Sequence, residues 1–200
     1  MIMVLLSLLA GGLAGYLFLP PGMVGILDQV SMLALYLLVF LVGVEIGTNR
    51  KVLKNLKILG KNIIRVSGAA LLGTLVGGIA AGLIFGMPGN ISLAIASGFG
   101  WYSLSGVLLK ELAGTEVGTI AFIANVFREL FAFLLIPWLA VRLNYQTAIA
   151  PAGATSMDTT LPLITQSTDE ETAVVAFGNG FILSSLVPVL VPLMYSLPFK

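Results

Sequence analysis

The sequence predicts an all-α polytopic membrane protein with about seven hydrophobic segments, two of them discontinuous or re-entrant. Of its 200 residues, 58% are hydrophobic and only 10% are charged, whereas soluble domains carry about 25% charged residues. The apolar residues form long runs instead of the short alternating strands of a membrane β-barrel. We therefore expect a single integral membrane transport domain over residues 1–200.

The composition also limits the chemistry. The chain contains no His and no Cys, which excludes thiol catalysis, disulfides, His-ligated haem and the usual zinc sites. We expect no cofactor and no metal, and any proton-handling group must be Asp, Glu, Lys, Arg or Tyr. The net charge of +1 gives no reason to expect a nucleic-acid partner.

The first two predicted spans cover residues 2–19 and 30–48. The N-terminal stretch lacks the basic region and cleavage site of a signal peptide, so we interpret it as a retained span. Glu45 lies near the end of the second span. A helix-end carboxylate is the favoured interpretation of Glu45, and an intramembrane acid is the alternative.

Residues 49–65 carry six of the ten basic residues and no acidic one: Arg50, Lys51, Lys54, Lys57, Lys61 and Arg65. The positive-inside rule makes this loop cytoplasmic and predicts a cytoplasmic N-terminus. The spacing of three to four residues predicts a short amphipathic helix on the membrane surface.

A third span over 63–86 precedes two interrupted segments, at 91–111 and 150–166. The first contains three Gly and three Ser within 97–106, which weaken a helix intrinsically. The second is broken by Pro and Gly within 151–162. Free backbone groups at membrane depth are tolerated only where protein or a cavity satisfies them, so both breaks should lie inside the bundle. Whether these segments cross the membrane or re-enter stays open.

The fifth span, 117–141, carries Asn125, Arg128 and Glu129 near its middle. Their i, i+3, i+4 spacing predicts one shared helix face. Because a charge at membrane depth costs about 2.5–3.5 kcal/mol, that face should line protein or a water-filled cavity. A substrate or proton site is the favoured interpretation, and a structural ion pair is the alternative.

The last span, 172–198, follows an acidic turn at residues 169–171 that predicts a helix N-terminus. A shift of 55 residues aligns Gly98 with Gly153 and brings Asn125 within one position of Asn179, which indicates a possible internal repeat. Paired interrupted segments are the best sequence indication of a transporter site. Broken helices place N–H groups for an anion at mid-membrane, while acids such as Glu129 and Asp158 suit a cation.

Four stretches resemble one family in order and spacing: ASGFGWYSLSGVLL (96–109), NVFREL followed by LIP (125–130 and 135–137), GATSMDTTLP (153–162) and GFILSSLVPVLVP (180–192). Together they resemble the bacterial lysine exporters of the LysO type over nearly the whole chain. The resemblance implies a secondary active exporter of L-lysine and analogues such as thialysine across the cytoplasmic membrane, with proton antiport as the expected coupling.

By this resemblance, Glu129 and Asp158 match the acids of the family's R-E-L and S-M-D motifs, which would carry a proton or pair with the substrate ammonium. Arg128 would hold the α-carboxylate or pair with Asp158. Trp101 and Tyr102 would stack on a cation, with plain packing as an even alternative. Further polar residues are cavity candidates: Ser103, Ser105, Asn125, Thr155, Ser156 and Asn179.

Longer members of the family carry an additional N-terminal block of helices, and this chain resembles their C-terminal part. The family also occurs as two polypeptides, so the expected partners are a second copy or a short membrane subunit. Another small amino or organic acid remains an alternative substrate. A membrane-embedded enzyme, a channel and a non-transporting subunit are the rival function classes, and the lack of His, Cys and paired acids argues against the enzyme.

Overall fold

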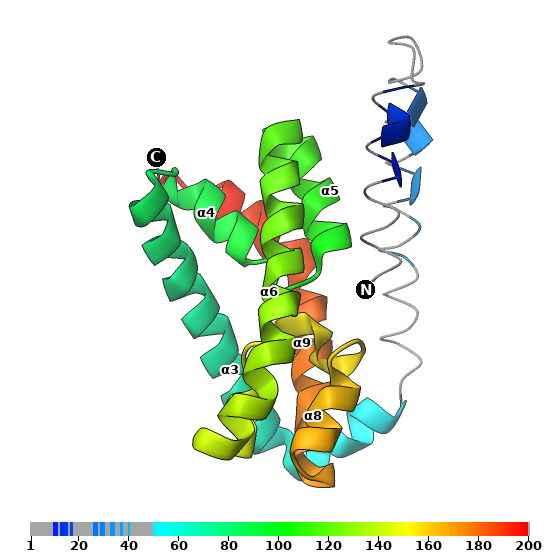
Figure 1. The fold of residues 1–200 in the computed structure, drawn as a ribbon, viewed down its shortest axis with the longest axis vertical. Coiled ribbons are helices and arrows are strands. Elements are labelled where there is room, and N and C mark those ends of the chain that lie inside the picture. Colours follow the sequence, from blue (N-terminus) through cyan, green and yellow to red (C-terminus); the bar gives the residue numbers. More distant parts are fainter. Residues whose placement is uncertain are drawn as a thin grey trace. The chain divides into compact units, whose positions relative to one another are not determined.

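The computed structural model describes residues 50–199, with side chains from Gly60 onward, and individual positions between residues 10 and 40. The chain divides into two units, residues 1–41 and 42–200, and every described position of the first unit is helical. The spans predicted at 2–19 and 30–48 lie largely outside the described residues, and Glu45 lies outside them. The described part of the chain is all-helical and contains no β-strand (Figure 1).

The second unit contains the helices α3 (Arg50–Phe85), α4 (Gly89–Ala96), α5 (Tyr102–Ala113), α6 (Thr115–Arg142), α7 (Tyr145–Ile149), the 3₁₀ helix η2 (Gly153–Met157), α8 (Leu161–Ser167) and α9 (Glu170–Tyr195). Three stretches of the described residues are long and apolar enough to cross a bilayer: Gly60–Phe85, Thr115–Arg142 and Glu170–Tyr195. They agree with the predicted third, fifth and seventh spans. Asp169 caps α9, as the acidic turn predicted, by accepting a hydrogen bond from the Thr172 amide at 2.8 Å.

The helix predicted at residues 49–65 is present from Arg50, but it is continuous with the third span and is not a separate short helix. α3 runs from Arg50 to Phe85 without a break. The basic residues therefore lie in the N-terminal part of the helix whose later residues, from Gly60 on, are apolar enough to cross a bilayer. No proline interrupts this stretch, and a spacing of three to four residues fits a continuous helix as well as a surface helix.

α4 and α5 form a hairpin that folds back on itself. At its start, the Asn90 backbone amide donates to the Phe199 carbonyl, which lies beyond the end of α9. The Asn90 side chain donates to the carbonyl of Tyr195, the last residue of α9. At its end, Gly114 alone separates α5 from α6. Both helices therefore lie in the same half of the bundle, the upper half in Figure 1.

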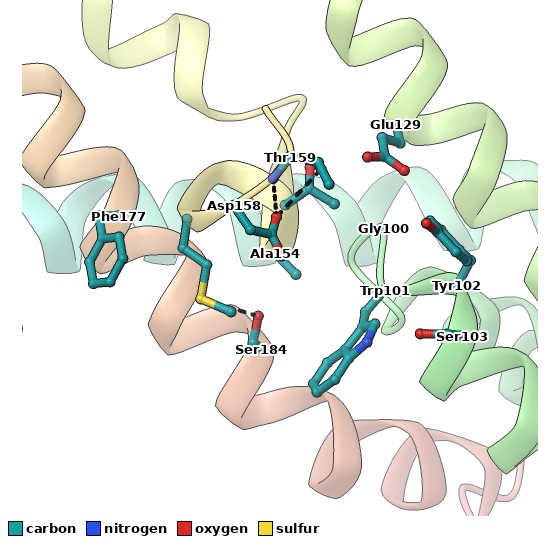
Figure 2. A pocket seen from close by; sticks show the side chains of 12 residues that line it. Gly100, Trp101, Tyr102, Ser103, Glu129, Ala154, Asp158, Thr159, Phe177 and Ser184 are labelled. Carbon is teal, nitrogen blue, oxygen red and sulfur yellow. Dashed lines mark hydrogen bonds between the residues drawn. The ribbon is translucent and has the colours of Figure 1, made fainter. Parts of the chain in front are cut away.

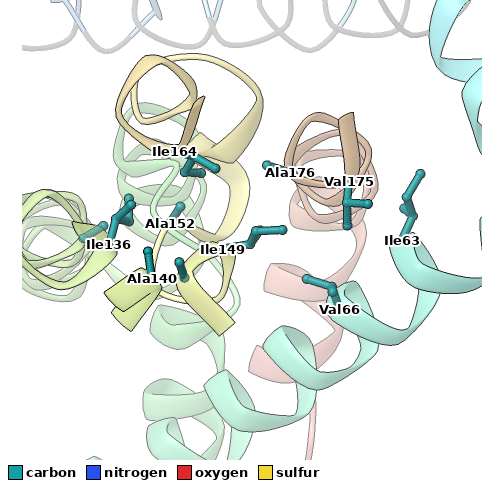
Figure 3. Close-up of a cluster of buried hydrophobic side chains, with 11 residues drawn as sticks. Ile63, Val66, Ile136, Ala140, Ile149, Ala152, Ile164, Val175 and Ala176 are labelled. Atoms are coloured by element: carbon teal, nitrogen blue, oxygen red, sulfur yellow. The ribbon is translucent and has the colours of Figure 1, made fainter. Parts of the chain in front are cut away.

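α7, η2 and α8 form a second hairpin at the opposite end of the bundle. α7 follows the end of α6 after two residues, and α8 ends two residues before α9 begins. A buried apolar cluster fixes this hairpin between α3, α6 and α9 (Figure 3). Its members are Ile63, Val66, Ala132, Ile136, Ala140, Ala148, Ile149, Ala152, Ile164, Val175 and Ala176.

The described part thus repeats one order of elements, a hairpin followed by a long helix. α4, α5 and α6 make the first copy, and α7, α8 and α9 make the second. α6 and α9 run in opposite directions (Figure 1). Large apolar side chains point outward from α3, α6 and α9, as a lipid-facing surface requires; examples are Leu83, Ile84, Leu134, Val141 and Val189.

Candidate functional site

The tip of the first hairpin is a sharp turn held by a side chain of α6. Phe99 and Gly100 both have left-handed backbone angles, φ 47° and φ 96°, and Phe99 is fully buried. The Asn125 side-chain oxygen accepts the Gly100 amide at 2.7 Å. Its amide nitrogen donates to the Ile95 carbonyl at 3.2 Å and to the Ser105 hydroxyl at 3.3 Å. Asn125 thus satisfies two backbone groups at the break, the Gly100 amide and the Ile95 carbonyl.

The tip of the second hairpin is held in a similar way by α9. The Asn179 amide nitrogen donates to the Gly153 carbonyl at 3.0 Å and to the Ser156 hydroxyl at 2.9 Å. The Ser156 hydroxyl in turn lies 2.8 Å from the carbonyls of both Gly153 and Ala176, and it can donate its one hydrogen to either. Asn125 and Asn179 therefore play matching structural roles in the two copies.

The two tips touch each other. The Ala154 amide donates to the Phe99 carbonyl at 2.8 Å, and Gly153 lies directly against the same carbonyl. A Cβ atom on Gly153 would overlap the Phe99 oxygen, so glycine is required for this approach. The contact joins two stretches that lie about fifty residues apart in the sequence.

A cavity of about 280 Å³ lies beside the touching tips (Figure 2). Its walls come from both tips, α6 and α9: Gly100, Trp101, Tyr102, Ser103, Glu129, Ala154, Thr155, Met157, Asp158, Thr159, Phe177 and Ser184. Its size approaches the lower end of the range for small-molecule sites, about 300–1,000 Å³. The cavity can therefore enclose a molecule no larger than a small metabolite.

Glu129 is the most unusual group in this cavity. Its side chain is 1% exposed, and neither carboxylate oxygen has a hydrogen-bond partner among the described residues. A buried carboxylate without partners is costly unless something pairs with it or protonates it. The Asp158 carboxylate also lines the cavity, and one of its oxygens accepts the Thr159 amide. The cavity thus combines two acids with the aromatic rings of Trp101 and Tyr102, and the Tyr102 ring packs edge-on against Phe122.

Arg128 does not line this cavity, so the prediction of one shared face for Asn125, Arg128 and Glu129 is wrong in part. The Arg128 guanidinium donates to the Pro151 carbonyl at 3.2 Å, the Ala150 carbonyl at 3.4 Å and the Thr74 hydroxyl at 3.0 Å. It borders an apolar groove between α3 and α6 instead. The reason is that consecutive helix positions diverge by about 100°, so Arg128 and Glu129 point to different sides.

Apart from Arg128, the contacts assign the predicted residues to two groups. Trp101, Tyr102, Ser103, Glu129, Thr155 and Asp158 line the cavity. Asn125, Ser105, Ser156 and Asn179 hold the hairpin tips. The sequence reasoning missed Thr74, Phe177 and Ser184. Thr74 was detectable as a polar residue in a glycine-rich span, and Ser184 as part of a Ser pair within the last span.

We expect Arg128→Met to destabilise the fold, because the carbonyls of Ala150 and Pro151 would lose their buried donor. The expected loss in the free energy of unfolding is about 3 kcal/mol. Arg128→Lys should have a stability between those of the wild type and Arg128→Met, since an ammonium cannot reproduce the guanidinium fork. Thermal unfolding in detergent measures the effect. An unchanged unfolding temperature for Arg128→Met would refute the structural role of Arg128.

Long apolar helices and two interrupted hairpins meeting at an acidic cavity define an all-helical integral membrane protein. The family model for the lysine exporter LysO matches residues 5–195, and the chain belongs to this family. No solved structure shows significant similarity.

Two curated relatives match the chain. The lysine exporter LysO of Escherichia coli K12 is 41% identical over 180 residues, which cover 90% of this chain and 58% of the relative. The putative lysine exporter of Haemophilus influenzae is 36% identical over 168 residues, which cover 84% of this chain and 85% of the relative. The chain therefore spans less than two thirds of the E. coli protein.

Proposed function

We propose that this protein is a secondary active transporter that exports L-lysine, and analogues such as thialysine, across the cytoplasmic membrane. The observation that carries the proposal is Glu129, a buried carboxylate without a protein partner in a cavity of metabolite size. Such a group suits an ammonium, and intramembrane acids mark transport pathways. The names of the two relatives support lysine as the substrate.

In this proposal, both hairpins re-enter the membrane from opposite sides and meet near its middle. Support comes from the positive-inside rule. If the two segments crossed, Arg142 would lie outside, away from the basic residues of α3. With two hairpins, Arg142 at the end of α6 lies at the same end of the bundle as Lys61 and Arg65, because Ile63 and Ala140 share one apolar cluster. That end is then cytoplasmic, and the repeat of hairpin plus helix is of the inverted type.

Proton antiport is the proposed coupling. Exporting a cation against the inside-negative potential costs about 2.3 kcal/mol per charge per 100 mV. A carboxylate cannot hold a proton and pair with an ammonium at the same time. Glu129 would therefore exchange substrate for a proton, and inward proton flow would drive export, with Asp158 as the second acid of the pathway.

Efflux of labelled lysine from cells that lack their own exporter tests this function. Cells expressing the chain should release lysine faster than cells with an empty vector, and an uncoupler should abolish the difference. Undiminished release in the presence of uncoupler would refute proton coupling.

A second candidate function is a transport subunit that needs another copy or a short membrane chain. The observation that favours it is that the match to this chain covers only 58% of the length of the E. coli relative. In that case the well-inserted chain alone would release no lysine, and coexpression of a short membrane subunit would restore release.

A further inference from the structure

The N-terminus of α5 opens into the cavity beside Glu129 and lacks a side-chain cap. Trp101 occupies the cap position and its side chain accepts no hydrogen bond. Within residues 60–199, the amides of Ser103 and Leu104 also find no acceptor, whereas the Ser105 amide bonds to the Trp101 carbonyl. Gly100, Trp101, Tyr102 and Ser103 all line the cavity (Figure 2). With 12 residues, α5 is long enough for its N-terminus to carry the positive end of a helix dipole. Its first amides have no partner within the helix and are free donors.

Glu129 is the second, independent observation in the same cavity. Its carboxylate is buried and has no partner in the described residues, so it requires a positive group or a proton. The cavity thus offers a site for an anion at α5 and sites for cations at Glu129 and Asp158. A ligand with both charges would satisfy both Glu129 and the α5 N-terminus.

We propose that the α5 N-terminus binds the α-carboxylate of the transported amino acid while Glu129 pairs with one of its ammonium groups. This inference rests on the proposed transport function. Lysine at neutral pH carries two ammonium groups and one carboxylate, which matches two acids and one helix N-terminus. Arg128 is excluded as the carboxylate ligand because its guanidinium is bonded to Thr74, Ala150 and Pro151 and does not line the cavity.

The carboxylate site makes the exporter specific for amino acids over diamines. Cadaverine is lysine without its carboxylate, and lysinamide replaces the carboxylate with a neutral amide. Both keep their ammonium groups but would leave the α5 amides without an anion. Losing a hydrogen-bonded charge from such a site should weaken binding at least about tenfold.

Binding of labelled L-lysine to the purified full chain in detergent, competed with cadaverine and with lysinamide, tests the inference on the wild type. Both competitors should need at least about ten times the concentration of unlabelled lysine. Equal competition by cadaverine would overturn the carboxylate site while leaving the transport function intact. No binding of lysine at all, together with no efflux, would refute the transport function and this inference with it.

Ser103→Pro tests the helix end directly. Proline removes the Ser103 amide donor and is tolerated in the first turn, as Pro162 at the start of α8 illustrates. Lysine binding should weaken about tenfold while cadaverine binding stays the same. Glu171→Pro is the matched control, since it places proline at the second position of α9, away from the cavity. Loss of both ligands in a folded Ser103→Pro variant would contradict a carboxylate-specific role.

Discussion

Replacing Glu129 with glutamine should abolish lysine efflux without harming the fold. Glutamine keeps the size of the side chain but can neither pair with an ammonium nor exchange a proton at neutral pH. Truncating one member of a buried charge pair costs about 2–5 kcal/mol, so transport should fall by about 30-fold or more. Because the carboxylate has no protein partner in the described residues, its replacement removes no hydrogen bond.

The stability of this variant separates a transport role from a structural one. Removing an unpaired buried charge should leave the unfolding temperature unchanged or raise it. Glu116→Gln is a matched control, because Glu116 lies on the same helix but is exposed at its start. The control should export like the wild type. Efflux at the wild-type rate from Glu129→Gln would show that Glu129 is not on the transport path.

Hydropathy predicts the spanning helices well because crossing a bilayer imposes a minimum length and apolarity. The spans expected at 63–86, 117–141 and 172–198 agree with α3, α6 and α9. The two interrupted segments were also visible, because Gly, Ser and Pro weaken a helix wherever they occur.

The direction of the chain after each break could not be predicted from local sequence. It depends on contacts between distant residues, such as Asn90 with Phe199 and Asn125 with Gly100. The position of Arg128 was also unpredictable, because its acceptors, Thr74 and the carbonyls after α7, come from two other elements. Glu129 was the part of the site that the sequence could predict, because a carboxylate within an apolar run is energetically costly in a membrane and therefore indicates a function.

Replacing Gly153 with alanine should be the most damaging small substitution in the hairpin tips. Gly153 has φ 61°, where an alanine is strained by about 1–2 kcal/mol. The added Cβ would overlap the Phe99 carbonyl and lie 2.9 Å from an Arg128 guanidinium nitrogen. Overpacking of this kind costs about 1–3 kcal/mol more. The sum, about 3 kcal/mol, predicts a fall in unfolding temperature of roughly 10 °C.

Gly73→Ala is the control for this substitution, since nothing lies within 4 Å of a Cβ on Gly73 in the middle of α3. Alanine there should raise stability slightly because it favours a helix. Thermal unfolding of both variants in the same detergent gives the comparison. If Gly153→Ala unfolds at the wild-type temperature, the two tips do not approach as closely as described. The cavity beside them would then lack the wall that places the α5 N-terminus next to Glu129, so this result would also count against the carboxylate site.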